Sequence, residues 1–584
     1  MTSRSENGVR IAVIGGGVSG VLTAIHLLWR CRREDRVYLV EKSAKLGPGV
    51  AYGTRHPLHL ANIRAENMSA FADEPDHFVK WLGRLPEEER AKAGCKTMAG
   101  LFVRREIYGR YIQELLHDTI IRQGGSQNLF IVIDTATALR QDSTGLALET
   151  EVGRTYEVDA AVLAIGNFPP GDQDLPGYVN NPWAEDALDG LHPGLPVVII
   201  GTGLTAVDVM LMLQKRGFDG PIQAFSRHGL LPQAHAPSSP WSGFWLDADD
   251  RRSLVSLTRA VRREVRRAAA VGVGWRCVVD ALRPEVQSIW TELSMDDRRR
   301  FVHHLRPYWE SHRHRMAPPI AEAVAAMRKT GQLQIVSGRI NSIEPERNGL
   351  HVHWRSRGGA VGEILAQRVV DCRGPGTDYT RLRSSLTQQM LVDGLARPDA
   401  CRLGLEATTA GALVGGDGLP SSVIFGVGPV TRGTFWEITS VPDIREQAEA
   451  VAVSALAAAR DSRPFRVGAA GQVHFDTAPS LAAFARLGEP GRLPAKNGAA
   501  KALPIEVESL EILNPAPKTK TLKPQAFNLK SPASSANPTI TTAEEITPRS
   551  EAGFEKAIAE RRAEANRRAQ RRAHMALCHR RSAR

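Results

Sequence analysis

The chain has 584 residues, 42% of them hydrophobic and 24% charged, which is typical of a globular protein of two or three domains. Its six cysteines lie far apart without CxxC or zinc-type spacing, which argues against a disulfide scaffold, a zinc cluster and a dithiol redox centre. No apolar run is long enough to span a membrane and the polar residues 1–10 form no secretory signal, so we expect a cytoplasmic protein without integral membrane contact.

The first predicted unit is a strand at 10–14, a glycine-rich loop and an apolar helix at 18–29. In the loop, Gly15 permits a tight turn, Gly17 lets the backbone approach a pyrophosphate, and Gly20 lets the helix pack on the strand. The N-terminus of that helix offers free N–H groups and a positive partial charge to a diphosphate. We include Ser19, which lies in the same loop, among the predicted cofactor-binding residues.

Glu41 ends the next predicted strand, 37–40. A carboxylate at this place accepts hydrogen bonds from both hydroxyls of an adenosine ribose. With strand, loop, helix, second strand and terminal acid in the required order, the sequence predicts an FAD site at the N-terminus.

The chain then alternates between helical and strand patterns. We predict helices at 75–82 and 105–123, and strands at 129–133, 146–149 and 159–166, after an irregular stretch at 46–73.

A second strand–loop–helix unit begins at 196–200. Gly201 and Gly203 repeat the first two glycines, and Ala206 replaces the third, as the fingerprint allows. The following strand, 222–226, ends in Ser226 and Arg227 rather than in an acid, and such residues favour a 2′-phosphate. The second site is therefore predicted to prefer NADPH over NADH. The alternative is that Arg227 is only a solvated residue at a strand end.

Two further buried strands end in glycine, at Gly166 and Gly374. In a protein with two nucleotide-binding domains, such strand ends mark where the chain crosses from one domain to the other.

Residues 247–329 predict helices rich in Arg and His, including five arginines within 259–267. Three interpretations remain open: a solvated basic face, a cap that binds an acidic substrate or the cofactor phosphates, and a metal site formed by the histidines. The metal site is the least favoured, because no carboxylate or cysteine partners share the spacing. We predict no bound metal.

After residue 332 the strand pattern returns, and a last amphipathic helix is predicted at about 435–459. Beyond residue 462 apolar periodicity is poor, and 518–547 is rich in Pro, Ser, Thr and Lys, which predicts a disordered tail. Much of the net charge of +12 lies in this tail. Its Arg pairs could attract nucleic acid or lipid headgroups, or could simply be solvated.

Two glycine fingerprints, each followed by a strand ending in glycine, resemble the two-dinucleotide-binding-domain flavoproteins. Within these, residues 10–460 are similar to the bacterial FAD-NAD(P)-binding family, a distant relative of flavin-containing monooxygenases and amino-acid N-hydroxylases. The segments that carry this closer similarity are 46–53, 59–62, 68–71, 102–111, 275–283, 300–306, 312–315 and 428–437.

The resemblance implies an FAD-dependent oxidoreductase whose flavin is reduced by NADPH, with oxygen-dependent hydroxylation of a small, unknown substrate. It places Asn62 and Met68 beside the flavin ring or the ribityl chain and Gly428 near the flavin. His56, His59 and Arg432 are candidates for the acid–base group, which the sequence does not identify.

Two departures limit this implication: the Baeyer–Villiger fingerprint is missing, and Ile165-Gly166-Asn167 replaces the usual Thr-Gly-Tyr type of sequence. The alternatives are an NAD(P)H-dependent flavin dehydrogenase or reductase without monooxygenation, and a flavin-binding regulator of low turnover.

The predicted fold class is α/β, with two Rossmann-like domains, a helical insertion and a disordered C-terminal tail. The predicted boundaries are 8–190 for the first part of the FAD domain, 191–240 for the NADP unit, 241–332 for the insertion, 333–461 for the return to the FAD domain, and 462–584 for the tail.

Overall fold

A computed structural model describes residues 8–122, 127–142, 145–171, 173–184, 186–242, 244 and 246–462. The chain divides into two units, Met1–Leu493 and Pro494–Arg584, and all described residues belong to the first. The predicted tail, residues 463–584, therefore lies outside the described residues. Among the described residues, no helix has both the length and the apolar character needed to cross a membrane.

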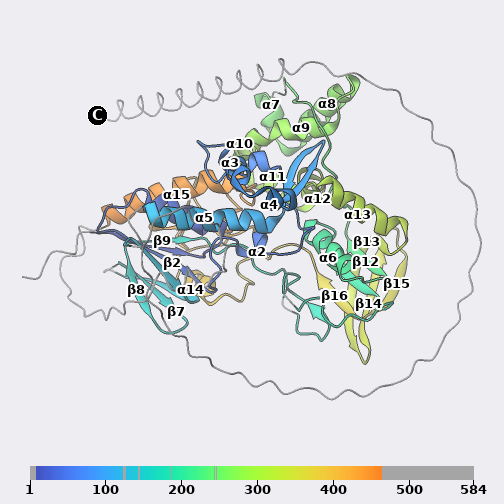
Figure 1. Cartoon of the computed structure of the whole chain (residues 1–584), viewed down its shortest axis with the longest axis horizontal. Coiled ribbons are helices and arrows are strands. Elements are labelled where there is room, and N and C mark those ends of the chain that lie inside the picture. Colours follow the sequence, from blue (N-terminus) through green and yellow to red (C-terminus); the bar gives the residue numbers. More distant parts are fainter. Residues whose placement is uncertain are drawn as a thin grey trace, which may run out of the picture. The chain divides into compact units, whose positions relative to one another are not determined.

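The first sheet contains six strands in the order β17-β18-β9-β1-β2-β5. Figure 1 labels two of them, β9 and β2. These strands are β1 Arg10–Ile14, β2 Arg36–Glu41, β5 Leu129–Ile133, β9 Ala160–Leu163, β17 Ala412–Val414 and β18 Pro420–Gly426. All neighbours pair in parallel except β17 and β18. Parallel strands are covered on both faces, so their sequences are almost continuously apolar.

Helices cover one face of this sheet, where Ile11 and Val13 of β1 point. These helices are α1 Val18–Leu28, α5 Arg105–Arg122 and α15 Val441–Asp461. Ala12 and Ile14 point to the opposite face, which packs against a three-stranded antiparallel sheet and α14. The elements there are β6 Ala136–Asp142, β7 Gly145–Thr150, β8 Thr155–Val158 and α14 Ser385–Val392.

Short elements connect β2 to α5. They are α2 Gly49–Tyr52, η1 Ala65–Asn67, α3 His77–Arg84, α4 Glu87–Lys92 and the hairpin of β3 Gly94–Thr97 with β4 Gly100–Val103.

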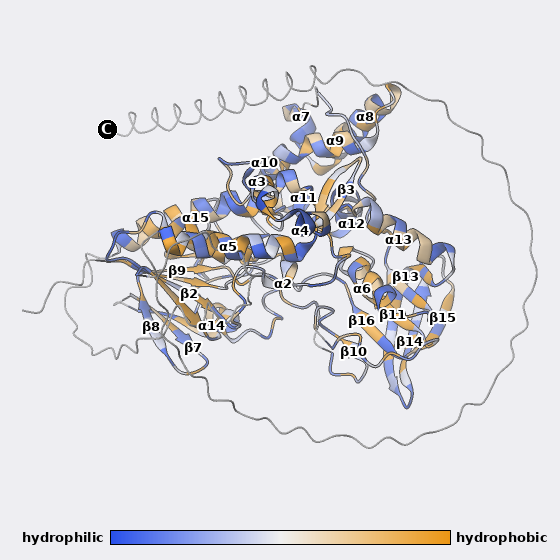
Figure 2. Ribbon diagram, in the orientation of Figure 1, coloured by the Kyte–Doolittle hydropathy of each residue, from blue (hydrophilic) through white to orange (hydrophobic). Residues whose placement is uncertain are grey.

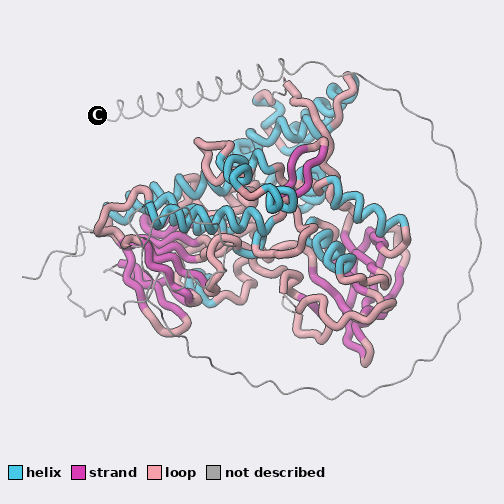
Figure 3. The backbone as a smooth tube through the Cα atoms, in the orientation of Figure 1, coloured by secondary structure: helices cyan, strands magenta, loops and turns pink. Residues whose placement is uncertain are grey.

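The second sheet has seven strands in the order β10-β16-β11-β12-β13-β14-β15. They are β10 Tyr178–Val179, β11 Val197–Ile200, β12 Ile222–Ser226, β13 Leu333–Glu346, β14 Gly349–Ser356, β15 Val361–Ala366 and β16 Arg368–Asp371. α6 Leu204–Lys215 and α13 Pro318–Lys329 pack on one face. Figure 3 shows the two separate groups of strands and the helices beside them, and in Figure 2 the buried strands are mostly hydrophobic.

The predicted return to the FAD domain at residue 333 is wrong. β13 continues the second sheet, because Leu333 pairs with Ile222 of β12, and β14 to β16 belong to the same sheet. Tyr178 of β10, which was assigned to the first domain, also pairs within the second sheet. The domain built on the second sheet thus spans about residues 178–371, far more than the 191–240 predicted for the NADP unit.

The chain crosses between the two sheets twice, and the two crossings lie side by side. The Gly376 N–H donates to the carbonyl of Phe168 at 3.0 Å, so the segment that leaves the first sheet pairs with the segment that returns to it.

The predicted helical region is present as a set of short helices. They are α7 Ala248–Arg251, α8 Leu254–Ala270, α9 Trp275–Leu282, η2 Arg283–Glu285, α10 Val286–Glu292, α11 Met295–Arg300, the π-helical turn η3 Phe301–Leu305 and α12 Arg306–Arg313. Their apolar side chains pack around Trp290, whose ring centroid lies 5.0 Å from that of Trp436 in the last part of the chain, with the two rings tilted by 32°.

The arginine run of α8 is largely a solvated face. Arg263 and Arg267 are more than half exposed and pair with Asp250 and Glu264. This supports the first of the three interpretations for residues 259–267.

Candidate functional site

The first glycine loop joins β1 to α1, and two of its glycines are needed by the chain itself. Gly15 has φ +109°, a conformation that favours glycine, and a Cβ there would overlap the carbonyl oxygen of Ala164 at the end of β9. A Cβ on Gly20 would overlap the carbonyl oxygen of Gly15. Both residues thus close the loop tightly against the strand and the helix, in the way the sequence predicted.

Gly17 is different, because nothing in the protein requires a glycine there. Its φ of −76° and ψ of −171° are open to any residue, and the nearest atom to a Cβ would be the Gly49 Cα at 3.6 Å. Gly17 is also the N-cap of α1 and makes no side-chain cap hydrogen bond. The loop therefore leaves free space directly in front of unpaired N–H groups, which suits an anionic ligand.

The second loop repeats this geometry closely. Gly201 has φ +103°, and a Cβ there would overlap the carbonyl oxygen of Cys372 at the end of β16. Gly203, the N-cap of α6, has φ −79° and ψ −170°, and a Cβ there would meet nothing within 4 Å. Ala206 lies in the first turn of α6 and is fully buried in the core. It occupies the position of the third glycine of the fingerprint.

Glu41 lies at the carboxyl end of β2, beside the first loop. Its Oε2 accepts a hydrogen bond from the Gly16 N–H at 2.7 Å, and its Oε1 accepts one from the Ser43 N–H at 3.3 Å. The carboxylate is therefore held next to the loop, and its remaining lone pairs are available to a ribose.

Gly428 lies against the first loop although it is distant in sequence. A Cβ on Gly428 would lie 2.5 Å from the Ser19 Oγ, and the Gly428 N–H donates to the Gln447 Oε1 at 2.7 Å. The chain continues through the turn η4 Gly428–Thr431, and α15 begins at Val441 rather than at the predicted residue 435. Pro442 at the second position of α15 is typical of a helix start.

Gly166 and Gly374 follow β9 and β16, which pair with β1 and β11. Each therefore lies on the strand next to a glycine loop, and a Cβ on either would meet nothing within 4 Å. The two predicted crossing points occupy equivalent places in the two sheets.

Asn62 and Met68 differ in what they offer to a ligand. Met68 is fully buried in the core of the first domain, so its side chain presents no surface to a cofactor. Asn62 is half-buried, and its carbonyl accepts a hydrogen bond from the His235 Nε2 at 3.0 Å.

His59 lies at the contact between the two domains. Its Nε2 is 3.2 Å from the carbonyl of Asp208 in α6, and the Asp208 carboxylate pairs with Arg105 of α5 at 2.8 Å. Burial and the nearby Arg105 charge lower the pKa of His59 to about 4. Burial and the neighbouring His59 lower the pKa of His56 to about 4 as well. Both histidines are therefore neutral at pH 7.

A cavity of about 950 Å³ opens at the second loop. The residues of the second fingerprint that line it are Gly201, Gly203, Ser226, Arg227 and Gly374. Arg227 is exposed there, and the Ser226 hydroxyl accepts from the Gly229 N–H at 3.0 Å and lies 2.8 Å from the Thr202 hydroxyl.

The helical insertion forms another part of the cavity wall. The sequence did not predict which residues of the insertion line this wall. Val302 and His303 of the π-helical turn line the cavity, and such turns occur frequently at functional sites. Arg306 and Glu310 of α12 also line it, together with Arg432 from the last part of the chain.

Two guanidinium groups of the cavity wall share the carboxylate of Glu310. Glu310 pairs with Arg306 at 2.9 Å and with Arg432, only 6% exposed, at 3.1 Å. Burial opposes ionisation of Glu310, but the two guanidinium groups outweigh it and hold its pKa below the usual value. Burial also lowers the pKa of the neighbouring His314. Because two guanidinium groups pair with a single carboxylate, this part of the cavity wall carries a net positive charge.

A second buried ion pair lies close by in the insertion. Glu437 and Arg313 are 5% and 9% exposed, and the Arg313 Nε lies 3.3 Å from the Glu437 Oε2. The Trp309 Nε1–H donates to the other oxygen of Glu437 at 2.9 Å. This pair joins α12 to the segment before α15.

Comparison with known proteins agrees with this geometry. Residues 12–168 match the model of an FAD-NAD(P)-binding family. An uncharacterized protein of Mycobacterium tuberculosis strain H37Rv is 21% identical over 76% of this chain and 95% of its own length. An FAD-binding monooxygenase of Aspergillus terreus is 26% identical over 39% of this chain and 35% of its own length.

Solved structures extend the similarity over most of the described residues. The reduced form of an ornithine hydroxylase from Pseudomonas aeruginosa has a TM-score of 0.54 at 13% identity, covering 77% of this chain and 99% of that one. An ornithine N-hydroxylase from Kutzneria sp. 744, solved with reduced FAD, NADP⁺ and L-ornithine, has a TM-score of 0.53 at 12% identity, with the same coverage of both chains. Residues 12–168 are therefore an FAD-NAD(P)-binding domain, and the chain has the fold of the ornithine N-hydroxylases, which confirms the predicted α/β class.

Proposed function

We propose that this protein is an FAD-dependent oxidoreductase whose flavin is reduced by NADPH and which then hydroxylates a small substrate with oxygen. The observation that carries the proposal is the pair Gly17 and Gly203. Both are glycines whose backbone angles and surroundings would accept a side chain, so a ligand explains their identity better than the fold does.

The predicted residues fall into two groups by position. The FAD group is Gly15, Gly17, Ser19, Gly20, Glu41, Asn62, Gly166 and Gly428, and the NADPH group is Gly201, Gly203, Ala206, Arg227 and Gly374. Ala206 and Met68 are both fully buried, so Ala206 is kept only for its place in the fingerprint, and Met68 is a core residue.

Held at the glycine loops after β1 and β11, FAD and NADPH would supply the hydride and redox chemistry. The chain's own part is to bind and orient. The N-termini of α1 and α6 direct N–H groups at the two diphosphates, and Glu41 fixes the ribose at the first loop. The tight closure at Gly15 and Gly201 keeps each loop rigid.

The positively charged wall of the cavity can bind an anionic group. Arg306 and Arg432 share only one carboxylate, Glu310, so an anion entering the cavity is stabilised there. This corresponds to the second interpretation of the Arg/His region, a cap that binds an acidic substrate or the cofactor phosphates.

Arg227→Ala is expected to weaken NADPH binding by roughly tenfold or more, because a charge-assisted hydrogen-bond set to the 2′-phosphate is lost. NADH, which lacks this phosphate, should be affected little. Dissociation constants for both nucleotides, from the concentration dependence of flavin reduction in a stopped-flow instrument, measure the difference. Arg259→Ala, an exposed residue of α8, is the control. An equal loss for both nucleotides would contradict the assignment of Arg227.

The proposed reaction is tested by mixing the yellow protein anaerobically with NADPH and then with oxygen. Rapid bleaching by NADPH in preference to NADH, followed by oxygen consumption without stoichiometric hydrogen peroxide when the substrate is present, is the expected result. Bleaching followed by electron transfer only to added acceptors would support a reductase. A flavin that NADPH fails to reduce would support the regulatory alternative and overturn the proposal.

A further inference from the structure

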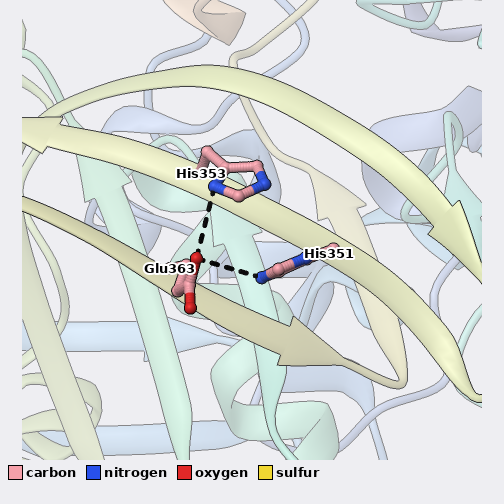
Figure 4. Close-up of side chains that lie close together, drawn as sticks. All are labelled: His351, His353 and Glu363. Carbon is pink, nitrogen blue, oxygen red and sulfur yellow. Dashed lines mark ion pairs between the residues drawn. The ribbon is translucent and has the colours of Figure 1, made fainter.

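A cluster of two histidines and a glutamate lies at the edge of the second sheet, on β14 and β15 (Figure 4). His351 and His353 alternate along β14 with Leu350 and Val352, which are fully buried in the core. Because side chains of a strand alternate between its faces, both histidines lie on the face opposite that core. Glu363 of β15 is directly opposite His353 in the pairing register.

The three side chains converge on one point. The Glu363 Oε2 lies 3.5 Å from the His351 Nε2 and 3.6 Å from the His353 Nδ1. Two ligands of a tetrahedral metal, each bonded at about 2.0–2.1 Å, are about 3.3 Å apart. The side chains are at least one quarter exposed, so small rotations bring all three atoms to bonding distance.

A fourth residue orients one of the histidines. The Glu346 carboxylate of β13 lies 3.0 Å from the His351 Nδ1. In neutral imidazole this contact holds the proton on Nδ1 and leaves the Nε2 lone pair directed at the Glu363 oxygen, which is itself an acceptor. A ligating histidine needs this tautomer, with Nε2 open to the metal and Nδ1–H donating to a carboxylate.

We propose that His351, His353 and Glu363 bind a divalent transition metal such as Zn²⁺, and that Glu346 is the positioning residue for His351. Imidazole and carboxylate are donors that Zn²⁺ and its neighbours accept, and a carboxylate behind a ligating histidine is the usual outer partner. With neutral histidines the two carboxylates leave a local charge that a divalent ion balances. Three protein ligands leave a fourth position for water or for a group from a partner.

This site is independent of the proposed reaction, since none of its residues lines the cavity at the second glycine loop. Neither the cysteine spacing nor the histidines of the helical region point to this site. The signal that would have found the site is His-x-His within a predicted strand, but its glutamates come from neighbouring strands whose register the sequence does not give.

The test is a titration of the full chain, prepared without a histidine tag and treated with a chelator, with ZnCl₂ by calorimetry and with CoCl₂ by visible absorption. The wild type should bind one saturable equivalent that His351→Gln and His353→Gln each lose. Glu346→Gln should keep the stoichiometry but lower the affinity by about 10–100-fold, as expected for an outer partner.

His117→Gln, which changes an exposed histidine of α5, is the matched control and should bind as the wild type does. Far-UV circular dichroism and flavin content check the fold of each variant, and Glu363→Gln replaces any histidine variant that fails this check. An unchanged stoichiometry and affinity in the folded variants, or no saturable binding by the wild type, would overturn the proposal. In that case the contacts of His351 with the Glu346 and Glu363 carboxylates are only structural.

Discussion

Gly17→Val is expected to purify as a folded but colourless protein. The valine side chain would enter the space in front of the α1 N-terminus, where only the Gly49 Cα lies within 4 Å, and would displace the diphosphate. Because the Gly17 angles suit any residue, the substitution introduces no backbone strain. Flavin released by heating should fall to background, while circular dichroism and the urea midpoint of the apoprotein stay near those of the wild-type apoprotein.

Gly203→Val is the matched variant, since Gly203 occupies the same place in the second loop with backbone angles within a few degrees. It should keep its FAD and its yellow colour but lose reduction by NADPH. Together the two variants separate the cofactors. The assignment would fail if Gly17→Val retained FAD, or if Gly203→Val were reduced by NADPH at the wild-type rate.

Glu437→Gln is expected to destabilise the protein by about 3–5 kcal/mol at pH 7, the cost of leaving a buried charge without its partner. The amide still accepts the Trp309 hydrogen bond, so the variant removes the charge and little else. Arg313, only 9% exposed, would remain buried without this counter-ion. The midpoint of urea unfolding, followed by tryptophan fluorescence, measures the change.

The control is Glu149→Gln, which breaks the surface pair with Arg140 at 2.7 Å. Arg140 is 56% exposed, so solvent screens this pair and its loss should cost far less than the loss of the buried Glu437 charge. Similar losses in the two variants would show that burial does not set the strength of the Glu437 pair.

The buried Glu437 also predicts that the stability of the protein depends on pH. Burial opposes ionisation of Glu437, but Arg313, His314 and the Trp309 hydrogen bond outweigh it and lower its pKa below 4.5. A carboxyl whose pKa is lower in the folded state stabilises the fold above its unfolded pKa, and this contribution is lost as the pH falls through the folded value. The difference between wild type and Glu437→Gln should therefore shrink below about pH 4.5. A difference that stays constant down to pH 3 would contradict this assignment.

Local patterns predicted much of the fold and part of the candidate site. The roles of Gly15, Gly17 and Gly20 follow from their spacing and from neighbouring strands and helices, and the structure shows the expected close contacts at Gly15 and Gly20 and free space at Gly17. β12 has the predicted bounds, Ile222–Ser226. Such elements are determined by residues close in sequence, which explains why they could be recognised.

What failed depended on contacts between distant residues. The apolar runs after residue 332 look alike whichever sheet they join, and only the pairing of β13 with β12 assigns them to the second. Arg306 and Glu310 are four residues apart in a helix, but Arg432 joins them from 122 residues beyond Glu310.

The adjacent crossings at Phe168 and Gly376 suggest how such a chain arises. Insertion of one unit into another is tolerated where the ends of the inserted unit lie close together at the surface of the host, and here the two crossings are joined by a backbone hydrogen bond. The inserted unit also repeats the plan of its host, with β11, α6, β12 and β16 in the places of β1, α1, β2 and β9. The arrangement is therefore that of one α/β unit inserted into a loop of another unit of the same plan.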